Sequence, residues 1–332
     1  MIEVWSYDEG VEAPASVTLD SLPEPKPDRI VWIECEEPDA AEVERLGTVL
    51  RLHEFVIEDL RNAGQRTKLD HYADHFHVAV HDCEYRDDHL VTREIDIVFG
   101  EGWILTVRQP AEDGNDVEPQ DFPMGMVKRR FESQRRQHGT TDEGFLLWSM
   151  LDVIVDRYFE VTDAIDVRLD GVEEVILDNT VDHLRRDHAR ELFEVGKSLL
   201  EFRRRALPLR EVVGQLLRGE APCVGPAAIV HFQDLYDHVL RVADMLDTQR
   251  EVVTGLRDAD LAVTSNQMSG VQQKIAAWGA ILLVATLLTG VLGMNFRNAP
   301  ELDWEEGFAI ILGIAALCGV PLYVYFKRKH WL

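Results

Sequence analysis

The chain has 332 residues, of which 60 are acidic and 34 basic, so its formal charge at neutral pH is −26. This excess of acids argues against a nucleic-acid partner, because phosphate binding requires a basic surface. Apolar residues make up 46% of the chain, which excludes disorder throughout, and the 4 cysteines form no CxxC pair that would suggest a disulfide framework or a zinc cluster.

Residues 1–144 have the pattern of an α/β domain. Strands are predicted at residues 30–34 and 76–81, the latter from a period-two alternation. Residues 95–99 and 103–107 predict a hairpin that turns at Gly100–Gly102. The stretch 110–123 is acidic and rich in Pro and Gly, which predicts an exposed loop. The start of the chain is acidic and lacks a signal-peptide pattern, so we expect this domain in the cytoplasm.

Charged helices are predicted over residues 145–224, where prolines at 222 and 226 break the pattern. No further proline occurs before Pro300, so residues 225–296 can form one stalk helix. A helix of about 70 residues would be about 105 Å long at 1.5 Å per residue.

Two stretches near the C-terminus, residues 275–296 and 307–326, contain no Asp, Glu, Lys, Arg or His. Each is long enough to cross a bilayer, which takes about 20 apolar residues. The connection 297–306 is acidic and the tail 327–332 is basic, and basic segments favour the cytoplasmic side. The sequence therefore predicts a multi-pass protein of the inner (plasma) membrane with both termini in the cytoplasm.

One face of the first predicted span carries mostly small residues. Gly279, Leu283, Thr286, Gly290 and Gly293 recur at steps of four and three. Such a face allows two membrane helices to approach closely, or it leaves an open lumen when several copies surround an axis.

The tripeptide Gly293-Met294-Asn295 ends this span, and the loop continues to Pro300-Glu301-Leu302. Upstream, the segment His53–Leu60 contains the pair Glu58-Asp59. It is followed by Arg66, Lys68 and Tyr72, which have the spacing RxKxxxY. In these motifs, which are spread over most of the chain, the sequence resembles the CorA family of divalent-cation channels.

The resemblance implies an α+β cytoplasmic domain (an α/β/α sandwich), a long stalk helix and two C-terminal transmembrane helices, assembled as a pentameric funnel. It implies influx of Mg²⁺, with Co²⁺ and Ni²⁺ as further candidates, down the electrochemical gradient. The selectivity filter would be Gly293, Met294 and Asn295, whose oxygens accept hydrogen bonds from the ion's water shell. Glu301 and Asp303 would attract cations to the entrance. The expected pore-lining residues are Gln272, Ile275, Gly279, Leu283, Thr286 and Gly290.

The resemblance also implies regulatory metal sites between subunits. Asp258 matches the family's regulatory stalk aspartate, and Asp234 matches a stalk acid that pairs with a neighbouring α/β domain. The partner would be one of four acids near the end of a strand: Asp82, Glu84, Asp87 or Asp88, of which Asp87 and Asp88 are preferred. Carboxylates brought together repel unless a cation bridges them, so cytosolic Mg²⁺ would hold the channel closed. Mg²⁺ would be both cargo and regulator, with no organic cofactor; the partners would be further copies of the chain, the lipid bilayer and divalent cations.

Three other functions share some of these features. A zinc transporter of the same superfamily, with or without proton coupling, shares the tripeptide. A membrane-tethered metal sensor that does not conduct would share the overall plan. A metalloenzyme is disfavoured, because His77 and His81 on one strand would lie about 13 Å apart, and no nucleotide-binding or hydrolase motif occurs in the sequence.

Overall fold

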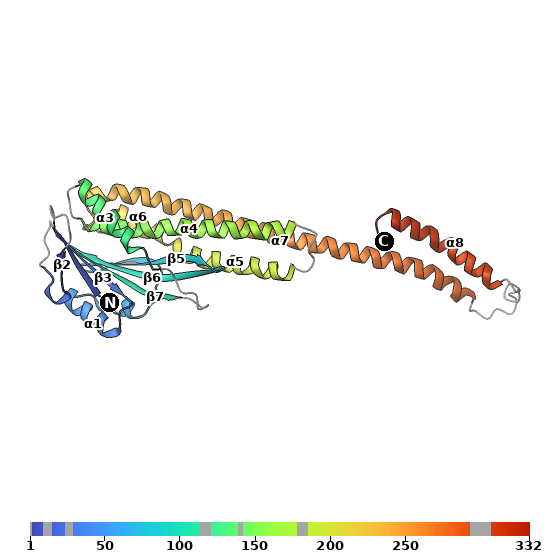
Figure 1. Ribbon diagram of the computed structural model, residues 1–332, viewed down its shortest axis with the longest axis horizontal. Helices are drawn as coiled ribbons and strands as arrows, with labels where there is room; N and C mark the ends of the chain where they lie inside the picture. The colour runs from blue at the N-terminus through green and yellow to red at the C-terminus, as the bar shows by residue number, and fades with distance from the viewer. Residues whose placement is uncertain are drawn as a thin grey trace. The chain divides into compact units, whose positions relative to one another are not determined.

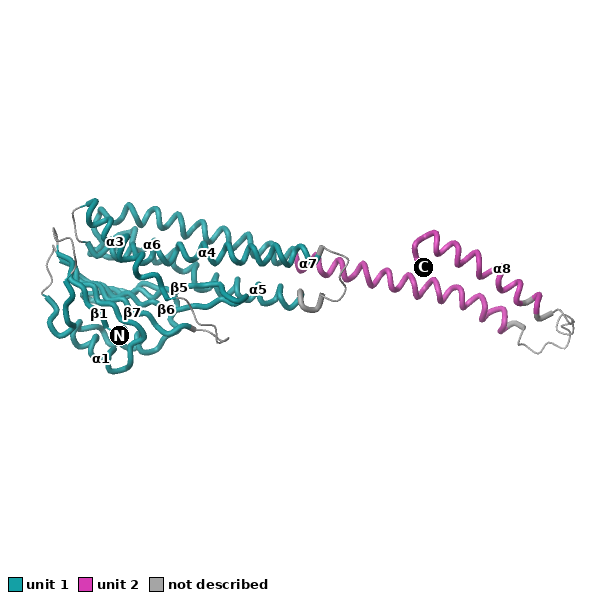
Figure 2. Tube along the Cα trace, in the orientation of Figure 1, with its two compact units in different colours: residues 1–255 teal, residues 256–332 magenta. Residues whose placement is uncertain are grey.

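The computed structural model describes residues 2–8, 15–23, 29–112, 121–138, 142–177, 185–292 and 307–332. The chain divides into two units, Met1–Gly255 and Leu256–Leu332 (Figure 2). Helix α7, Pro226–Leu292, contributes residues to both units.

A seven-stranded sheet of order β2-β1-β3-β7-β6-β5-β4 forms the middle layer of the first unit (Figure 1). Among the described strands, β3 and β7 pair in parallel and all other neighbours are antiparallel. The predicted hairpin is confirmed, since Gly100 of β6 pairs with Trp103 of β7. The strands are β1 (Ile2–Asp8), β2 (Ala15–Ser16), β3 (Arg29–Glu36), β4 (Lys68–His71), β5 (Phe76–Arg86), β6 (His89–Gly100) and β7 (Trp103–Glu112).

Helices α1 (Ala40–Leu50) and α2 (Glu54–Arg61) follow the short 3-10 helix η1 (Leu19–Ser21) and β3, and they cover one face of the sheet. Asp39 caps α1, because its Oδ1 accepts a hydrogen bond from the Glu42 amide at 2.8 Å while the Glu42 carboxylate accepts from the Asp39 amide. The apolar sides of α1 and α2 pack on β3, β6 and β7 through a cluster that includes Val31, Ile33, Val43, Leu46, Val56, Leu60, Val98 and Leu105.

Four helices cover the other face or pack on those that do (Figure 1): α3 (Met124–His138), α4 (Glu143–Leu177), α5 (Arg185–Ala206) and α6 (Leu209–Leu217). Tyr158 of α4 ties this layer to the sheet by donating to the carbonyl of His81 at 2.6 Å. The predicted α/β/α sandwich is confirmed. Because both faces of the sheet are covered, residues 76–83 of β5 are all buried, so the alternation in this strand does not mark a solvent-exposed face.

The prediction of a loop over residues 110–123 is wrong at its start. Strand β7 continues through Pro110 to Glu112, and residues 113–120 lie outside the described part of the chain. The register shifts between Arg93 and Ile95, so that Gln109 and Pro110 together oppose Glu94. A proline has no amide hydrogen to donate, and a bulge is a place where a sheet tolerates that loss.

The expected stalk helix is confirmed as α7, a single helix of 67 residues. Among the described residues it is the one helix that is long and apolar enough to cross a bilayer. Helix α8, Gly307–Arg328, extends over the second predicted span and contains Pro321.

Candidate functional site

The six residues expected to line a pore lie on one face of α7. At about 100° per residue they fall within a sector of about 80° around the helix axis. All six are exposed in the single chain, including Ile275 at 67% and Leu283 at 68%. They are Gln272, Ile275, Gly279, Leu283, Thr286 and Gly290.

The opposite face of the same helix segment is the more covered one. Ala277 is buried, and Ile281, Val284 and Leu288, which continue its row, are partly buried. Nearby, the ring of Trp278 lies 6.4 Å from the ring of Tyr323 in α8. Helix α8 therefore leaves the six-residue face free for a lumen or for another copy of the chain.

Two glycines on this face are not required by any contact among the described residues. A Cβ atom added at Gly279 or Gly290 would meet none of the described atoms within 4 Å. Alanine would favour the helix by about 1 kcal/mol at each position. The absence of side chains here therefore suits something outside this chain, such as a wide lumen or a close neighbouring helix.

Thr286 supplies a hydroxyl oxygen to this face. Its hydroxyl donates to the carbonyl of Leu282 at 2.8 Å, which uses the hydrogen but leaves lone pairs on the oxygen. Such an oxygen is a suitable acceptor for the water hydrogens of a hydrated cation. The predicted filter (Gly293, Met294, Asn295) and the entrance acids (Glu301, Asp303) lie outside the described residues, so these assignments remain predictions.

Both proposed regulatory aspartates on α7 are exposed. Asp258 precedes Gln272 by nearly four helical turns, so it lies within about 40° of it around the axis. No described cation forms an ion pair with Asp258. Asp234 has a weak partner, His238, whose Nε2 lies 3.9 Å from the Asp234 carboxylate.

Asp87 and Asp88 form the exposed turn between β5 and β6, and both have positive φ angles, 49° and 67°. Aspartate tolerates this conformation better than most residues. The Asp88 carboxylate accepts from Arg168 of α4 at 2.8 Å, and Arg168 also contacts Glu191 of α5 at 2.9 Å. The turn borders an open pocket of about 570 Å³. Arg168 is 80 residues away in sequence, so no pattern could have singled it out.

The other two candidate acids are already paired. Asp82 is buried and accepts from Arg157 of α4 at 2.5 Å; burial raises its pKa, while Arg157 and Arg93 act in the opposite direction. Glu84 lies 3.1 Å from Arg86 and 3.6 Å from Arg157. Asp82 therefore points into the fold, whereas Asp87 and Asp88 lie in an exposed turn.

An α/β domain that continues through one long helix into an apolar segment has the architecture of a membrane transport protein with a soluble domain. A family model described as CorA-like Mg²⁺ transporter protein matches residues 27–328. The chain belongs to this family, whose members are ion transporters and not enzymes.

Relatives agree with this membership. The cobalt/magnesium transport protein CorA of Thermotoga maritima is 28% identical over 292 residues, which cover 87% of this chain and 80% of that protein. The putative metal ion transporter YfjQ of Bacillus subtilis is also 28% identical, over 90% of this chain and 89% of its own length. The complete CorA structure from Methanocaldococcus jannaschii matches with a TM-score of 0.80 at 19% identity, covering 99% and 98% of the two chains. The ZntB cytoplasmic domain of Vibrio parahaemolyticus matches with a TM-score of 0.59 at 13% identity, covering 80% and 98%.

Proposed function

We propose that the chain forms a homopentameric channel in the inner membrane that admits Mg²⁺, and also Co²⁺ or Ni²⁺, into the cytoplasm. The observation that carries this proposal is the exposed face of α7 from Gln272 to Gly290, which is free of charge and ends just before Gly293-Met294-Asn295. Five such faces around an axis would line a conduit. A divalent cation that crosses it gains about 4.6 kcal/mol per 100 mV of membrane potential, twice the value for a single charge.

Selection in this proposal acts on the hydrated ion. Mg²⁺ prefers six oxygen ligands in octahedral geometry and loses its water reluctantly. A ring of Asn295 amide and backbone oxygens would accept hydrogen bonds from that water shell, and the Thr286 hydroxyl oxygens would form a second ring further in. Neutral acceptors suit passage, because a ring of five carboxylates would bind a divalent cation too tightly. Glu301 and Asp303 would raise the cation concentration at the entrance.

Closure would depend on cytosolic Mg²⁺. Asp234 of one subunit would face Asp87 or Asp88 of a neighbour, and Asp258 would lie at a second position between subunits further along the stalk; at each position the carboxylates would repel unless a cation lay between them. Bound Mg²⁺ would thus stabilise the closed arrangement, and its loss would shift the population toward the open one. Leu283 and Ile275 would form the apolar constriction that loses its water in the closed state.

Ion flux into proteoliposomes tests the proposal. Mg²⁺, Co²⁺, Ni²⁺ and Zn²⁺ are supplied in parallel, with and without a pH gradient, to the wild-type protein and to Asn295→Ala. We expect Mg²⁺ flux without a pH gradient, and its loss in Asn295→Ala with the same oligomer size in detergent.

Other outcomes are equally decisive. Undiminished Mg²⁺ flux through Asn295→Ala would contradict the filter assignment. Flux of Zn²⁺ alone, driven by the pH gradient, would establish the zinc-transporting alternative. No flux of any of the four ions would favour the sensor that does not conduct.

A further inference from the structure

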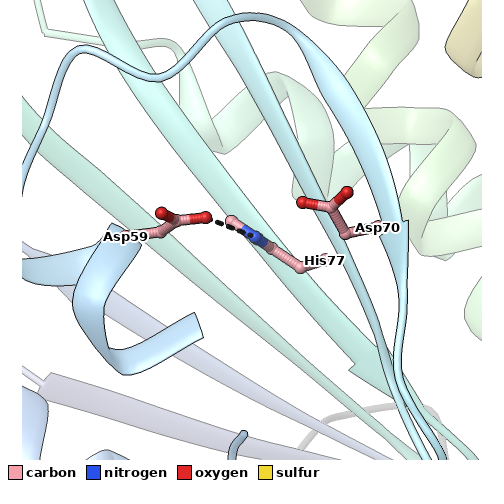
Figure 3. A group of neighbouring side chains, drawn as sticks. All are labelled: Asp59, Asp70 and His77. Carbon is pink, nitrogen blue, oxygen red and sulfur yellow. Dashed lines mark ion pairs between the residues drawn. The ribbon is translucent and has the colours of Figure 1, made fainter. Parts of the chain in front are cut away.

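Three side chains in the first unit bring metal-ligating atoms together, away from the pore face and the proposed regulatory acids. The carboxylates of Asp59 and Asp70 and the ring of His77 place one such atom each within 4.8 Å of one another (Figure 3). Asp70 of β4 and His77 of β5 are directly opposite each other in the antiparallel register. Asp59 comes from the last turn of α2. The group therefore brings together side chains from two strands and a helix.

The orientation of His77 is set by a second carboxylate behind it. His77 is fully buried, and its Nε2 lies 2.8 Å from Oδ1 of Asp96, which is buried as well. The other oxygen of Asp96 accepts from the Gln109 amide at 3.0 Å, which holds the carboxylate in place. Because an ionised carboxylate only accepts hydrogen bonds, the Nε2 atom of His77 must carry the hydrogen.

The other ring nitrogen of His77, Nδ1, indicates that a cation could bind here. Nδ1 of His77 is buried and has no hydrogen-bond partner among the described residues. It lies 3.7 Å from Oδ2 of Asp59, the contact that Figure 3 marks with a dashed line. In the neutral ring this nitrogen presents a lone pair, so an acceptor faces the oxygens of a carboxylate. A cation between them would satisfy both, and a histidine backed by a carboxylate is the usual arrangement behind a metal ion.

A cation already lies at the two carboxylates. The ammonium group of Lys68 is 2.7 Å from Oδ2 of Asp59 and 2.7 Å from Oδ2 of Asp70. It neutralises part of their charge, but it forms no hydrogen bond with the His77 ring. The side chains of Lys68 and Asp70 are 31% and 38% exposed, so the lysine has room to swing into water. A surface pocket of about 410 Å³, bordered by Asp59, Lys68 and Asp70, leads to this point.

We propose that Asp59, Asp70 and His77 form a binding site for a transition-metal dication such as Co²⁺, Ni²⁺ or Zn²⁺, which displaces the ammonium of Lys68. The imidazole nitrogen favours these ions over Mg²⁺, which prefers oxygen ligands. Water would complete the coordination from the side of the pocket. This site is independent of the transport proposal, because none of its residues belongs to the pore face, the filter or the intersubunit acids.

Binding of Co²⁺ to the purified full-length protein tests the inference, with millimolar Mg²⁺ present to occupy oxygen-only sites. Co²⁺ is followed by its visible absorption and by X-ray absorption at the cobalt edge, which reports a nitrogen ligand. We expect one Co²⁺ per chain with a nitrogen ligand. His77→Gln and Asp70→Asn should each weaken this binding at least tenfold, and Asp96→Asn should weaken it by about 10- to 100-fold. Lys68→Met should strengthen it, because the competing cation is gone.

His71→Gln is the matched control, since His71 is an exposed histidine on the same strand as Asp70 and should leave Co²⁺ binding unchanged. The inference is overturned if the bound Co²⁺ has only oxygen ligands. It is also overturned if Lys68→Met, with a far-ultraviolet spectrum like that of the wild type, binds Co²⁺ no more tightly. In either case the group is an ion-pair cluster that holds α2 to the sheet edge.

Discussion

The two parts of α7 differ in what covers them, although they belong to one helix. From Ala228 to Leu256 the buried positions recur at alternating steps of four and three: Ala228, Phe232, Leu235, Val239, Val242, Leu246, Gln249, Val253 and Leu256. Gln249 in this row donates to the carbonyl of Thr162 in α4 at 2.8 Å. Between residues 257 and 290, only Ala277 is buried.

The two parts of the helix therefore differ in where their packing partners lie. The first part of α7 finds its apolar partner within its own chain, in the way of an amphipathic helix on a domain. In the second part, residues 275–290 are apolar but mostly exposed, so their partner must be lipid or other copies of the chain. We therefore expect substitutions in the first part to change the stability of the domain, and substitutions beyond Leu256 to change transport or its control.

Phe232→Ala should give the largest effect on stability. Phe232 is fully buried, and removing such a ring costs about 3–5 kcal/mol. Val230→Ala, two residues away, is the matched control, since Val230 is 64% exposed and should change the free energy of unfolding by less than about 0.5 kcal/mol. Denaturant unfolding of the full-length protein in detergent measures both. Equal losses would mean that the row of buried positions is not the packing face.

A pH effect of intermediate size is expected in the first unit, at His81. Its Nε2 accepts from Arg205 at 2.7 Å, and Nδ1 lies 3.2 Å from the Thr67 hydroxyl, which itself donates to the Arg205 carbonyl. Burial, followed by the charges of Arg205 and Arg204, lowers the pKa of His81 from 6.5 to about 3. Below pH 6.5 His81 therefore binds a proton in the unfolded chain but stays neutral in the folded chain, so the free energy of unfolding falls as the pH falls.

The loss amounts to at most about 1.4 kcal/mol per pH unit, or about 2 kcal/mol between pH 6.5 and pH 5. His81→Asn lacks this proton, so its free energy of unfolding should fall less steeply over the same range. The comparison uses the slope and not the absolute stability, because the substitution itself costs a buried hydrogen bond. Parallel slopes for the two proteins would show that His81 protonates normally in the fold.

The smallest effect concerns Asp258, just past the end of the buried row. Asp258→Asn should raise the internal Mg²⁺ concentration that half-inhibits flux by about fivefold or more, the lower end of typical coupling energies. Asp260→Asn is the matched control, because it removes the same charge about 200° further around the helix. A shift of the same size in both variants would mean that general charge, and not a site at Asp258, controls inhibition.

Much of the fold follows from patterns that are local in sequence. The absence of proline after Pro226 predicts α7, and the apolar runs on either side of Gly100–Gly102 predict the β6–β7 hairpin. The end of β7 could not be predicted, because a proline at position 110 normally indicates a loop. The proline is tolerated here because it lies in a bulge opposite Glu94. The bulge depends on how two strands pair, which the sequence of one strand does not reveal.

Functional sites are likewise easier to predict when one segment carries all of their residues. The pore face could be predicted because one helix carries all of its residues at regular spacing. His77 and His81 are too far apart along one strand to share a metal ion, whereas Asp59 and Asp70 approach His77 from α2 and β4, which no single segment of sequence reveals. Likewise, nothing in the sequence distinguishes Asp82, which faces Arg157, from Asp87 and Asp88 in the exposed turn.

The parallel pairing of β3 with β7 has a consequence for biosynthesis. Val31 aligns with Trp103, so the centre of the sheet cannot close until the ribosome has passed Glu112. At about 5–20 residues per second, the apolar stretch from residue 275 is then still roughly 8–30 s from being made. The sheet thus has time to close before the apolar segment leaves the exit tunnel. The unpaired strands and the apolar helix are therefore not exposed together on the nascent chain, where they could aggregate.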